Sequence, residues 1–191
     1  MTGKIVTIAQ QKGGAGKTTL SVHLAVAWSR LKGKSVGVLD VDPQGSLGEW
    51  FEAREEALGE DATGLEFRTA SGWGARREAQ RLAREHDYVV VDTPPHADLE
   101  ARATETTLEL LGDAAPGIIV LNRVPPRGRL AGEMIEAMKE FGGDIAKNQL
   151  GNRVAYAECI AWGLSVQERS GNAKAVEEVE ALSAELRRRL G

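Results

Sequence analysis

Cysteine is almost absent from this chain of 191 residues, which contains only Cys159. A single thiol excludes an internal disulfide and the paired cysteines of a CxxC metal or cluster site. A reducing compartment is then the simplest setting, and we expect a cytoplasmic protein. The chain also lacks any apolar run near the ~18 residues that a membrane span needs, and its N-terminus shows no signal peptide.

A strong net charge is missing too. The formal charge is −4, so no global basic field attracts nucleic acid, and any such contact must come from a local patch. Repeats, low-complexity tracts and linkers are also absent. With 42% hydrophobic and 27% charged residues, the composition is that of a soluble globular protein. The length suits a single domain, residues 1–191.

What the chain does contain is an alternation of short apolar runs with helical segments, which predicts a parallel sheet covered by helices. Strands are predicted at Lys4–Gln10, Ser35–Asp42, Leu65–Ala70, Tyr88–Thr93 and Gly117–Val124. Helices are predicted at Lys17–Leu31, Gly48–Leu58, Ala75–Glu85, Arg129–Phe141, Arg153–Trp162 and Lys174–Leu190. The carboxyl ends of such strands share one edge of the sheet, where ligands bind. Four polar residues mark these ends: Gln10, Asp40, Asp92 and Asn122.

The segment KGGAGKTT, Lys12–Thr19, lies between a predicted strand and a predicted helix, as a phosphate-binding loop does. Glycines let successive backbone N–H groups approach phosphate oxygens, and the helix N-terminus adds partial positive charge. Lys17 can reach the β- and γ-phosphates, and the Thr18 hydroxyl can ligate Mg²⁺. The alternative is a glycine-rich turn without a ligand. The predicted nucleotide-binding residues here are Gly13, Gly14, Ala15, Gly16, Lys17, Thr18 and Thr19.

Aspartates end two of the predicted strands. Asp92 ends YVVVD, where an unpaired carboxylate is costly to bury, and Mg²⁺ with its waters would offset that cost. Asp40 and Asp42 point to the same side of their strand, with Asp42 further out. We expect Asp42 to orient the attacking water and Asp40 to support the Mg²⁺ shell. The alternatives are a helix-capping role for Asp92 and a simple turn at Asp42–Gly45.

Three segments together resemble the ParA/MinD family, the deviant Walker A ATPases: KGGAGKTT, then DVDPQG at Asp40–Gly45, then VVVDTPP at Val89–Pro95. The resemblance extends to Ile118–Pro126 and Gly151–Val166, and so covers most of the chain. It implies a three-layer α/β fold, a P-loop NTPase with a mostly parallel central sheet flanked by helices. Within the family the chain is most similar to small ParA-type partition ATPases, and we expect no N-terminal DNA-binding domain.

The resemblance also implies a role for Lys12 that the local chemistry supports. In this family the early lysine reaches across a nucleotide-sandwich dimer to phosphates held by the other subunit. Lys17 already serves the phosphates of its own chain, so a lysine at the rim of the loop can point outward and stabilise charge in trans. The alternative is a solvated surface lysine. The family further implies that Asn122 contacts the adenine base.

One departure from the family lies between Pro95 and Gly117. There the family has a further apolar strand and a proline-rich loop, whereas His96–Pro116 reads as mostly helical. Either the central sheet carries a deletion, or a stretch has been left out of the chain. The family's last strand, within Gly142–Val154, is also weak here because the segment has few β-branched residues.

The function implied by the resemblance is ATP-driven partition or positioning. An ATP-bound homodimer binds DNA without sequence preference, and a ParB-like or other cargo-adaptor protein stimulates slow, Mg²⁺-dependent hydrolysis to ADP and phosphate. Release then moves a plasmid, chromosome or protein cargo, with the ATPase associated with the nucleoid. Non-specific DNA binding needs several cations on one face. The candidates are Arg153, Arg169, Lys174, Arg187, Arg188 and Arg189. The alternative for the C-terminal arginines is a favourable contact with the helix dipole. A second basic stripe is interpreted as a solvated face: Arg77, Arg81 and Arg84.

Two alternatives to a DNA-bound partition ATPase stay open. A MinD-like protein binds membrane through its C-terminal helix, but Lys174–Leu190 lacks Trp and Phe and is acidic in its first half. We therefore expect its apolar stripe to pack on the domain. A metabolic enzyme of the same fold, such as a dethiobiotin synthetase-like ligase, would need neither Lys12 nor the DPQG loop in this form. A lone cysteine disfavours an iron–sulfur carrier.

Overall fold

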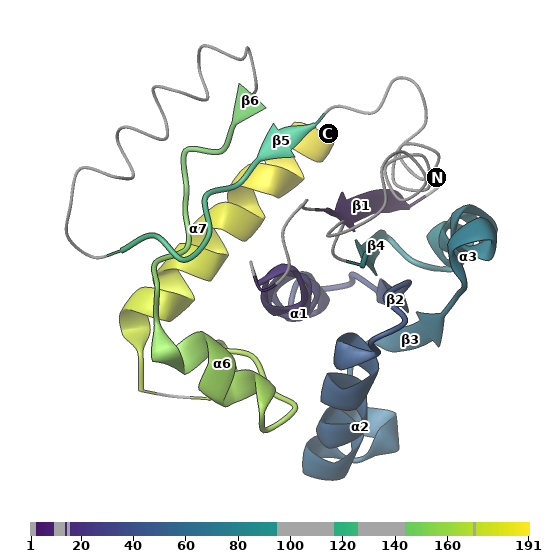
Figure 1. The fold of residues 1–191 in the computed structure, drawn as a ribbon, viewed down its shortest axis with the longest axis horizontal. Coiled ribbons are helices and arrows are strands. Elements are labelled where there is room, and N and C mark those ends of the chain that lie inside the picture. Colours follow the sequence, from purple (N-terminus) through teal and green to yellow (C-terminus); the bar gives the residue numbers. More distant parts are fainter. Residues whose placement is uncertain (1–2, 10–13, 15, 95–116, 126–143, 170) are drawn as a thin grey trace.

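The computed structural model describes residues 3–9, 14, 16–94, 117–125, 144–169 and 171–191 (Figure 1). Its strands are β1 (Lys4–Ile8), β2 (Val36–Asp40), β3 (Glu66–Thr69), β4 (Tyr88–Asp92), β5 (Ile118–Ile119) and β6 (Asp144–Ile145). Its helices are α1 (Lys17–Ser29), α2 (Ser46–Leu58), α3 (Gly72–Glu85), α6 (Val154–Ile160) and α7 (Ala173–Leu190), with a short 3-10 turn at Glu60–Ala62. The predicted α/β class is confirmed, because β1–β4 form a parallel sheet with helices on both faces.

The four-stranded sheet has the order β1-β4-β2-β3, and every pairing in it is parallel. β4 lies between β1 and β2 and is buried along its whole length. Its side chains alternate between two hydrophobic clusters: Tyr88 and Val90 join one, and Val89 and Val91 join the other. This alternation is why a strand that is apolar throughout forms here, since both faces of the sheet are covered.

The helices cover the two faces unequally. α1 packs against β4, β1 and β2 on one face, with α6 and α7 packed on α1, while α3 covers the other face (Figure 1). The apolar stripe of α7 packs on the domain as expected: Val179, Leu182 and Leu186 are buried in the larger cluster. None of the described helices is long and apolar enough to cross a membrane.

Residues 117–152 depart from the sequence expectations. Only Ile118–Ile119 of the predicted strand Gly117–Val124 is regular, and it pairs with β6 in a separate two-stranded sheet. The chain then runs on beside residues 146–152 through isolated bonds, such as Val124 N to Leu150 O at 3.0 Å. β5 has a described partner strand on one side only, so the backbone groups on its other side make no described strand pairing. This explains why only two residues of the predicted strand are regular. The helix predicted at Arg129–Phe141 and the interval His96–Pro116 lie outside the described residues.

The turn that follows α6 is joined to α2 by a buried arginine. Arg54 donates to the Thr63 and Gly163 carbonyls at 2.9 and 3.1 Å and pairs with Glu168 at 2.6 Å. Burial alone would raise the Glu168 pKa, but hydrogen bonds from Arg54 and the Ser165 backbone hold it below its usual value. Gly163 has φ +66°, and a Cβ there would overlap the backbone of Ala53 and Arg54. Glycine is therefore required where this turn meets α2.

Gly163→Ala should destabilise the protein more than Gly33→Ala does. Both glycines have φ near +70°, but nothing lies within 4 Å of a Cβ placed on Gly33. We expect Gly33→Ala to cost about 1 kcal/mol of backbone strain, and Gly163→Ala about 1–3 kcal/mol more from overpacking. Urea unfolding measures both values. Equal losses would show that the turn after α6 is not packed on α2 as described.

Candidate nucleotide-binding site

The start of α1 has the backbone of a phosphate-binding loop. Gly14 and Gly16 have φ of +74° and +84°, and Gly16 directly precedes the helix. Because Gly16 has φ +84°, any residue with a Cβ would be strained there, and that Cβ would lie 2.8 Å from the Asn122 amide nitrogen, which would have to move. No described side chain caps the N-terminus of α1, which leaves its first N–H groups to face a ligand. Lys12, Gly13 and Ala15 lie outside the described residues.

A buried carboxylate joins α1 to the centre of the sheet. The Thr18 hydroxyl donates to Asp92 Oδ2 at 2.6 Å, and the Ser21 hydroxyl donates to Asp92 Oδ1 at 3.0 Å. Burial raises the Asp92 pKa to about 6; the two hydroxyls and Lys17 oppose that rise, and neighbouring Asp40 adds to it. Sequence analysis placed Thr18 and Asp92 together, but not Ser21, whose one-turn spacing from Thr18 was the available signal.

Asp40 lies beside Asp92 at the carboxyl edge of the sheet. The two residues are partners in the parallel register of β2 and β4, so both carboxylates lie at the ends of neighbouring strands. Asp40 accepts from the backbone N–H of Asp42 at 2.9 Å and of Gly48 at 3.2 Å, which fixes the loop between β2 and α2. Burial raises its pKa, and these backbone bonds oppose the rise.

Asp42 is two residues beyond the end of β2 and lines the same cavity as Lys17 and Thr18. It accepts from the Gln44 N–H at 2.9 Å, so the DPQG segment is also a turn, as the alternative reading held. The turn and the proposed catalytic role are compatible, because the side chain is only half-buried and the cavity adjoins it.

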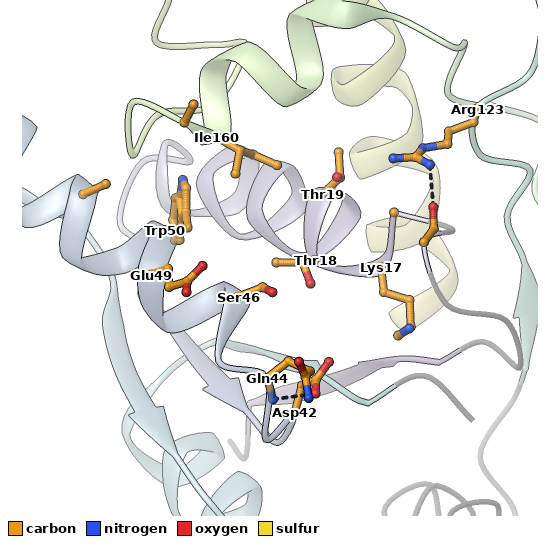
Figure 2. A pocket seen from close by; sticks show the side chains of 14 residues that line it. Lys17, Thr18, Thr19, Asp42, Gln44, Ser46, Glu49, Trp50, Arg123 and Ile160 are labelled. Carbon is orange, nitrogen blue, oxygen red and sulfur yellow. Dashed lines mark hydrogen bonds between the residues drawn. The ribbon is translucent and has the colours of Figure 1, made fainter. Parts of the chain in front are cut away.

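The cavity has a volume of about 610 Å³ and lies between α1, α2 and the turn after α6. Figure 2 shows Lys17 and Thr18 from α1 and Asp42 and Gln44 from the loop after β2 around one hollow. Eight of the lining residues are not among the site residues predicted from the sequence, and the large ones include Glu49, Trp50, Arg123 and Ile160. Three of these four come from helices whose positions depend on tertiary packing rather than on any local pattern.

Asn122 and Arg123, which follow β5, contact the phosphate loop. The Asn122 amide nitrogen donates to Gly16 O at 3.2 Å, and Arg123 donates to the Gly14 carbonyl (Figure 2). Arg123 has φ +55°, a strained value for a non-glycine residue, and Asn122 Oδ1 accepts its backbone N–H at 2.8 Å. Asn122 therefore lies at the loop, while its contact with adenine stays a prediction.

The oxygen groups at this edge fit a magnesium ion. Mg²⁺ prefers oxygen donors, binds through one or two carboxylates plus nucleotide phosphates, and keeps several of its waters. Thr18, Asp40 and Asp92 supply a hydroxyl and two carboxylates at the mouth of the loop, and burial raises the pKa of Asp92, a cost that a bound cation would offset. These residues would hold the ion, with Lys17 close enough to influence the same carboxylate.

The cations predicted to bind DNA are mostly engaged within the protein. Arg153 pairs with Glu178 at 2.6 Å, Lys174 pairs with Glu177 at 3.2 Å, and Arg189 pairs with Asp144 and Glu185. Arg169 lies over the Trp162 ring at 5.1 Å. Only Arg187 and Arg188 of the six candidates have no charged or aromatic partner among the described residues.

Comparison with known proteins decides the family. Residues 6–166 match the CobQ/CobB/MinD/ParA nucleotide binding domain, which includes the phosphate loop and every aspartate of the cavity. The chain belongs to this family. It is thus a ParA/MinD-family ATPase related to partition and carboxysome-positioning proteins, and the resemblance drawn from the sequence is confirmed.

Two ParA/MinD relatives cover most of the chain. "Maintenance of carboxysome distribution protein A" of Halothiobacillus neapolitanus is 26% identical over 190 residues, covering 84% of this chain and 85% of that protein. "Protein ParA" of Rhizobium radiobacter is 28% identical over 219 residues, covering 97% of both. That alignment is longer than this chain of 191 residues, so the relative has residues without a counterpart here.

A solved structure shares the fold. The crystal structure of a Borrelia burgdorferi B31 protein, described as a plasmid partition protein bound to AMPPNP, superposes with a TM-score of 0.64. It is 19% identical and covers 98% of this chain and 99% of that chain. The likeness confirms the P-loop fold of the ParA/MinD family.

Asp92→Asn should stabilise the ligand-free protein at neutral pH. The folded pKa of about 6 exceeds the unfolded value, so the contribution of Asp92 to stability is present below pH 4 and is lost as the pH rises through 6. We expect Asp92→Asn to be more stable on the order of 2 kcal/mol at pH 7.5, with no gain near pH 4.

Thermal unfolding with chelator and without nucleotide measures this difference across the pH range. Asp61→Asn, at an exposed position, is the matched control and should follow the wild type. A wild-type pH profile in the Asp92→Asn variant would mean that the buried carboxylate is not strained.

Proposed function

We propose that the chain is an ATP-dependent dimerising ATPase of the ParA type that positions cargo on DNA. The observation that carries the hydrolytic part is the placement of Asp42 on the cavity that Lys17 and Thr18 line. The relatives named for partition and for carboxysome distribution support the positioning part. The single domain spans residues 1–191 in this proposal.

We propose the following roles within one chain. The glycine loop and the start of α1 bind the phosphates, and Lys17 places a positive charge beside them. Thr18, Asp40 and Asp92 would hold Mg²⁺, which when bound neutralises charge on the phosphates. Asp42 orients the attacking water from the loop after β2 and accepts its proton. Asn122 contacts the adenine base once nucleotide is bound.

Dimerisation completes the site in this proposal. Lys17 of the chain itself already lines the cavity beside Gly14 and Gly16. Lys12 supplies a charge from the facing subunit, which couples hydrolysis to assembly. The ATP-bound dimer binds DNA non-specifically and associates with the nucleoid, and a ParB-like or other adaptor protein stimulates hydrolysis and release.

Gel filtration with a non-hydrolysable ATP analogue tests the assembly step. We expect the wild type to elute as a dimer with analogue and Mg²⁺ and as a monomer without, and to co-elute with duplex DNA only with analogue. Lys12→Ala should still bind the analogue but stay monomeric, because the charge in trans is lost. Lys32→Ala removes an exposed lysine elsewhere and is the matched control.

Two outcomes would contradict the proposal. A wild type that stays monomeric with bound analogue would remove the dimer. A Lys12→Ala variant that dimerises and hydrolyses normally would remove the trans lysine. ATP turnover that rises with a small carboxylate or amine, rather than with DNA and a partner protein, would favour a metabolic enzyme.

Asp42→Ala should trap the ATP-bound state. Without the carboxylate, the attacking water is neither oriented nor deprotonated, and we expect hydrolysis to fall roughly 100-fold or more. Nucleotide binding should be preserved, because Asp42 lies beyond the residues that contact the phosphates. Single-turnover hydrolysis and analogue affinity measure the two effects, and Lys17→Ala, which should lose binding itself, separates them. Unchanged turnover would exclude Asp42 from the mechanism.

A further inference from the structure

The outward face of α3 carries an exposed aromatic ring in line with three arginines. Trp73 is 92% exposed, and Arg77, Arg81 and Arg84 follow it at helical spacing and are all exposed. The opposite side of the helix, with Ala75 and Leu82 among others, is buried against the sheet. These four residues, Trp73, Arg77, Arg81 and Arg84, are called the α3 face below.

The acidic residues of α3 neutralise this face only in part. Glu78 and Glu85 both turn to Arg68 of β3, at 2.7 and 2.6 Å, and Arg68 also contacts Glu66. These ion pairs raise the Arg68 pKa further. One arginine from the sheet edge thus pairs with both carboxylates of the helix, which line the same hollow as the α3 face. Arg81 makes only a long contact with Glu85, at 3.9 Å.

The remaining arginines have no anionic partner. Neither Arg77 nor Arg84 is ion-paired within the part of the chain that the structure describes. By contrast, Arg153 and Arg189 have carboxylate partners at the other side of the molecule, where α6 and α7 lie (Figure 1). Four arginines, Arg68 among them, thus lie with three glutamates, Glu66, Glu78 and Glu85. In a chain with a net charge of −4, this excess of cations marks a local positive surface.

We propose that the α3 face binds the phosphate backbone of duplex DNA, an inference that rests on the DNA-binding function proposed above. Seven residues separate Arg77 from Arg84, which is about 10 Å along a helix axis. One DNA strand presents a phosphate about every 3.4 Å along its axis, so this length spans about four phosphates of a strand, and each of the three arginines can contact one of them. The indole ring of Trp73 packs against a deoxyribose of the DNA backbone at one end of the contact.

Nucleic acid fits this face better than an acidic peptide does. A docked peptide needs an apolar groove or a free strand edge for most of its affinity. All four residues of the α3 face line one hollow, whose other side chains are mainly polar or charged and include Thr69, Ser71, Glu78 and Glu85; Trp73 is the large apolar side chain there. Such a surface suits the phosphate backbone of nucleic acid, a repeating anion whose binding needs no pockets for side chains.

The α3 face also begins close to the nucleotide site. Thr69 at the end of β3 is the register partner of Asp40, and the Ala70 N–H donates to the Asp40 carbonyl at 3.0 Å. Trp73 follows three residues later, at the first turn of α3. The same carboxyl edge of the sheet therefore leads to both the nucleotide and the proposed DNA contact.

A triple variant, Arg77→Ala/Arg81→Ala/Arg84→Ala, tests the inference. Its affinity for an immobilised duplex of arbitrary sequence is measured with a non-hydrolysable ATP analogue over a series of salt concentrations. We expect the slope of log affinity against log salt to fall in magnitude by about three, with at least tenfold weaker binding. Trp73→Ala should weaken binding without changing the slope, because its contact is not ionic.

The matched control removes three exposed cations elsewhere, Arg30→Ala/Lys32→Ala/Lys147→Ala, and should keep both affinity and slope within about twofold of wild type. A second comparison, Arg187→Ala/Arg188→Ala, removes the unpaired arginines of α7. Analogue binding and dimer formation are measured for every variant, which separates a DNA defect from misfolding.

The outcomes separate the inference from the function on which it rests. A wild-type protein that binds DNA with analogue, together with a triple variant of unchanged affinity and slope, overturns the α3 face and leaves the proposed function standing. Loss confined to the α7 variant does the same. A triple variant that keeps DNA but loses stimulation by its activator shows a protein-docking face and also overturns the inference. A wild type that does not bind DNA overturns both.

Discussion

The buried carboxylate of Asp92 is the constraint around which the site is arranged. It ends the central strand of a sheet covered on both faces, where an unpaired charge is costly, and Thr18 and Ser21 donate to it from α1. These bonds fix the start of α1 against the sheet and so position the loop that precedes it. Burial nevertheless keeps the Asp92 pKa near 6. The two hydroxyls and Lys17 therefore offset only part of the cost of burying the ionised carboxylate, and a cation at this edge would offset the rest.

The local parts of this arrangement were predictable from sequence. Fully apolar strands with aspartates at their carboxyl ends placed Asp40 and Asp92 together, because parallel strands share one edge. The glycines of the loop and Thr18 followed from spacing alone. Arg123 was not predictable, since its contact with the loop depends on a strained backbone and a long-range approach. The arrangement of charge on the α3 face was not predictable either, because nothing local shows that Arg68 binds both glutamates; the sequence suggested an ordinary solvated surface.

The sheet itself is where the sequence was least informative. Among the described strands β1 pairs with β4 alone, and β5 and β6 form their own pair, whereas the sequence left the make-up of the central sheet open between a deletion and an omitted stretch. The relative of Rhizobium radiobacter has residues without a counterpart here, in keeping with the departure noted between Pro95 and Gly117. Asn122 nonetheless reaches the Gly16 carbonyl, so the second strand pair still contributes to the nucleotide site. The residues of the nucleotide site thus meet at the carboxyl edge of β1–β4 even though β5 and β6 form a separate sheet.

The claim that this edge is a joint site for nucleotide and magnesium has one direct measurement. Thermal unfolding is followed with ATP alone, with Mg²⁺ alone, and with both together. Ligands that share one site raise the unfolding temperature more together than the sum of their separate effects, since each completes the binding of the other. We predict such a synergistic rise. An equal rise with ATP in the presence of chelator would contradict the account.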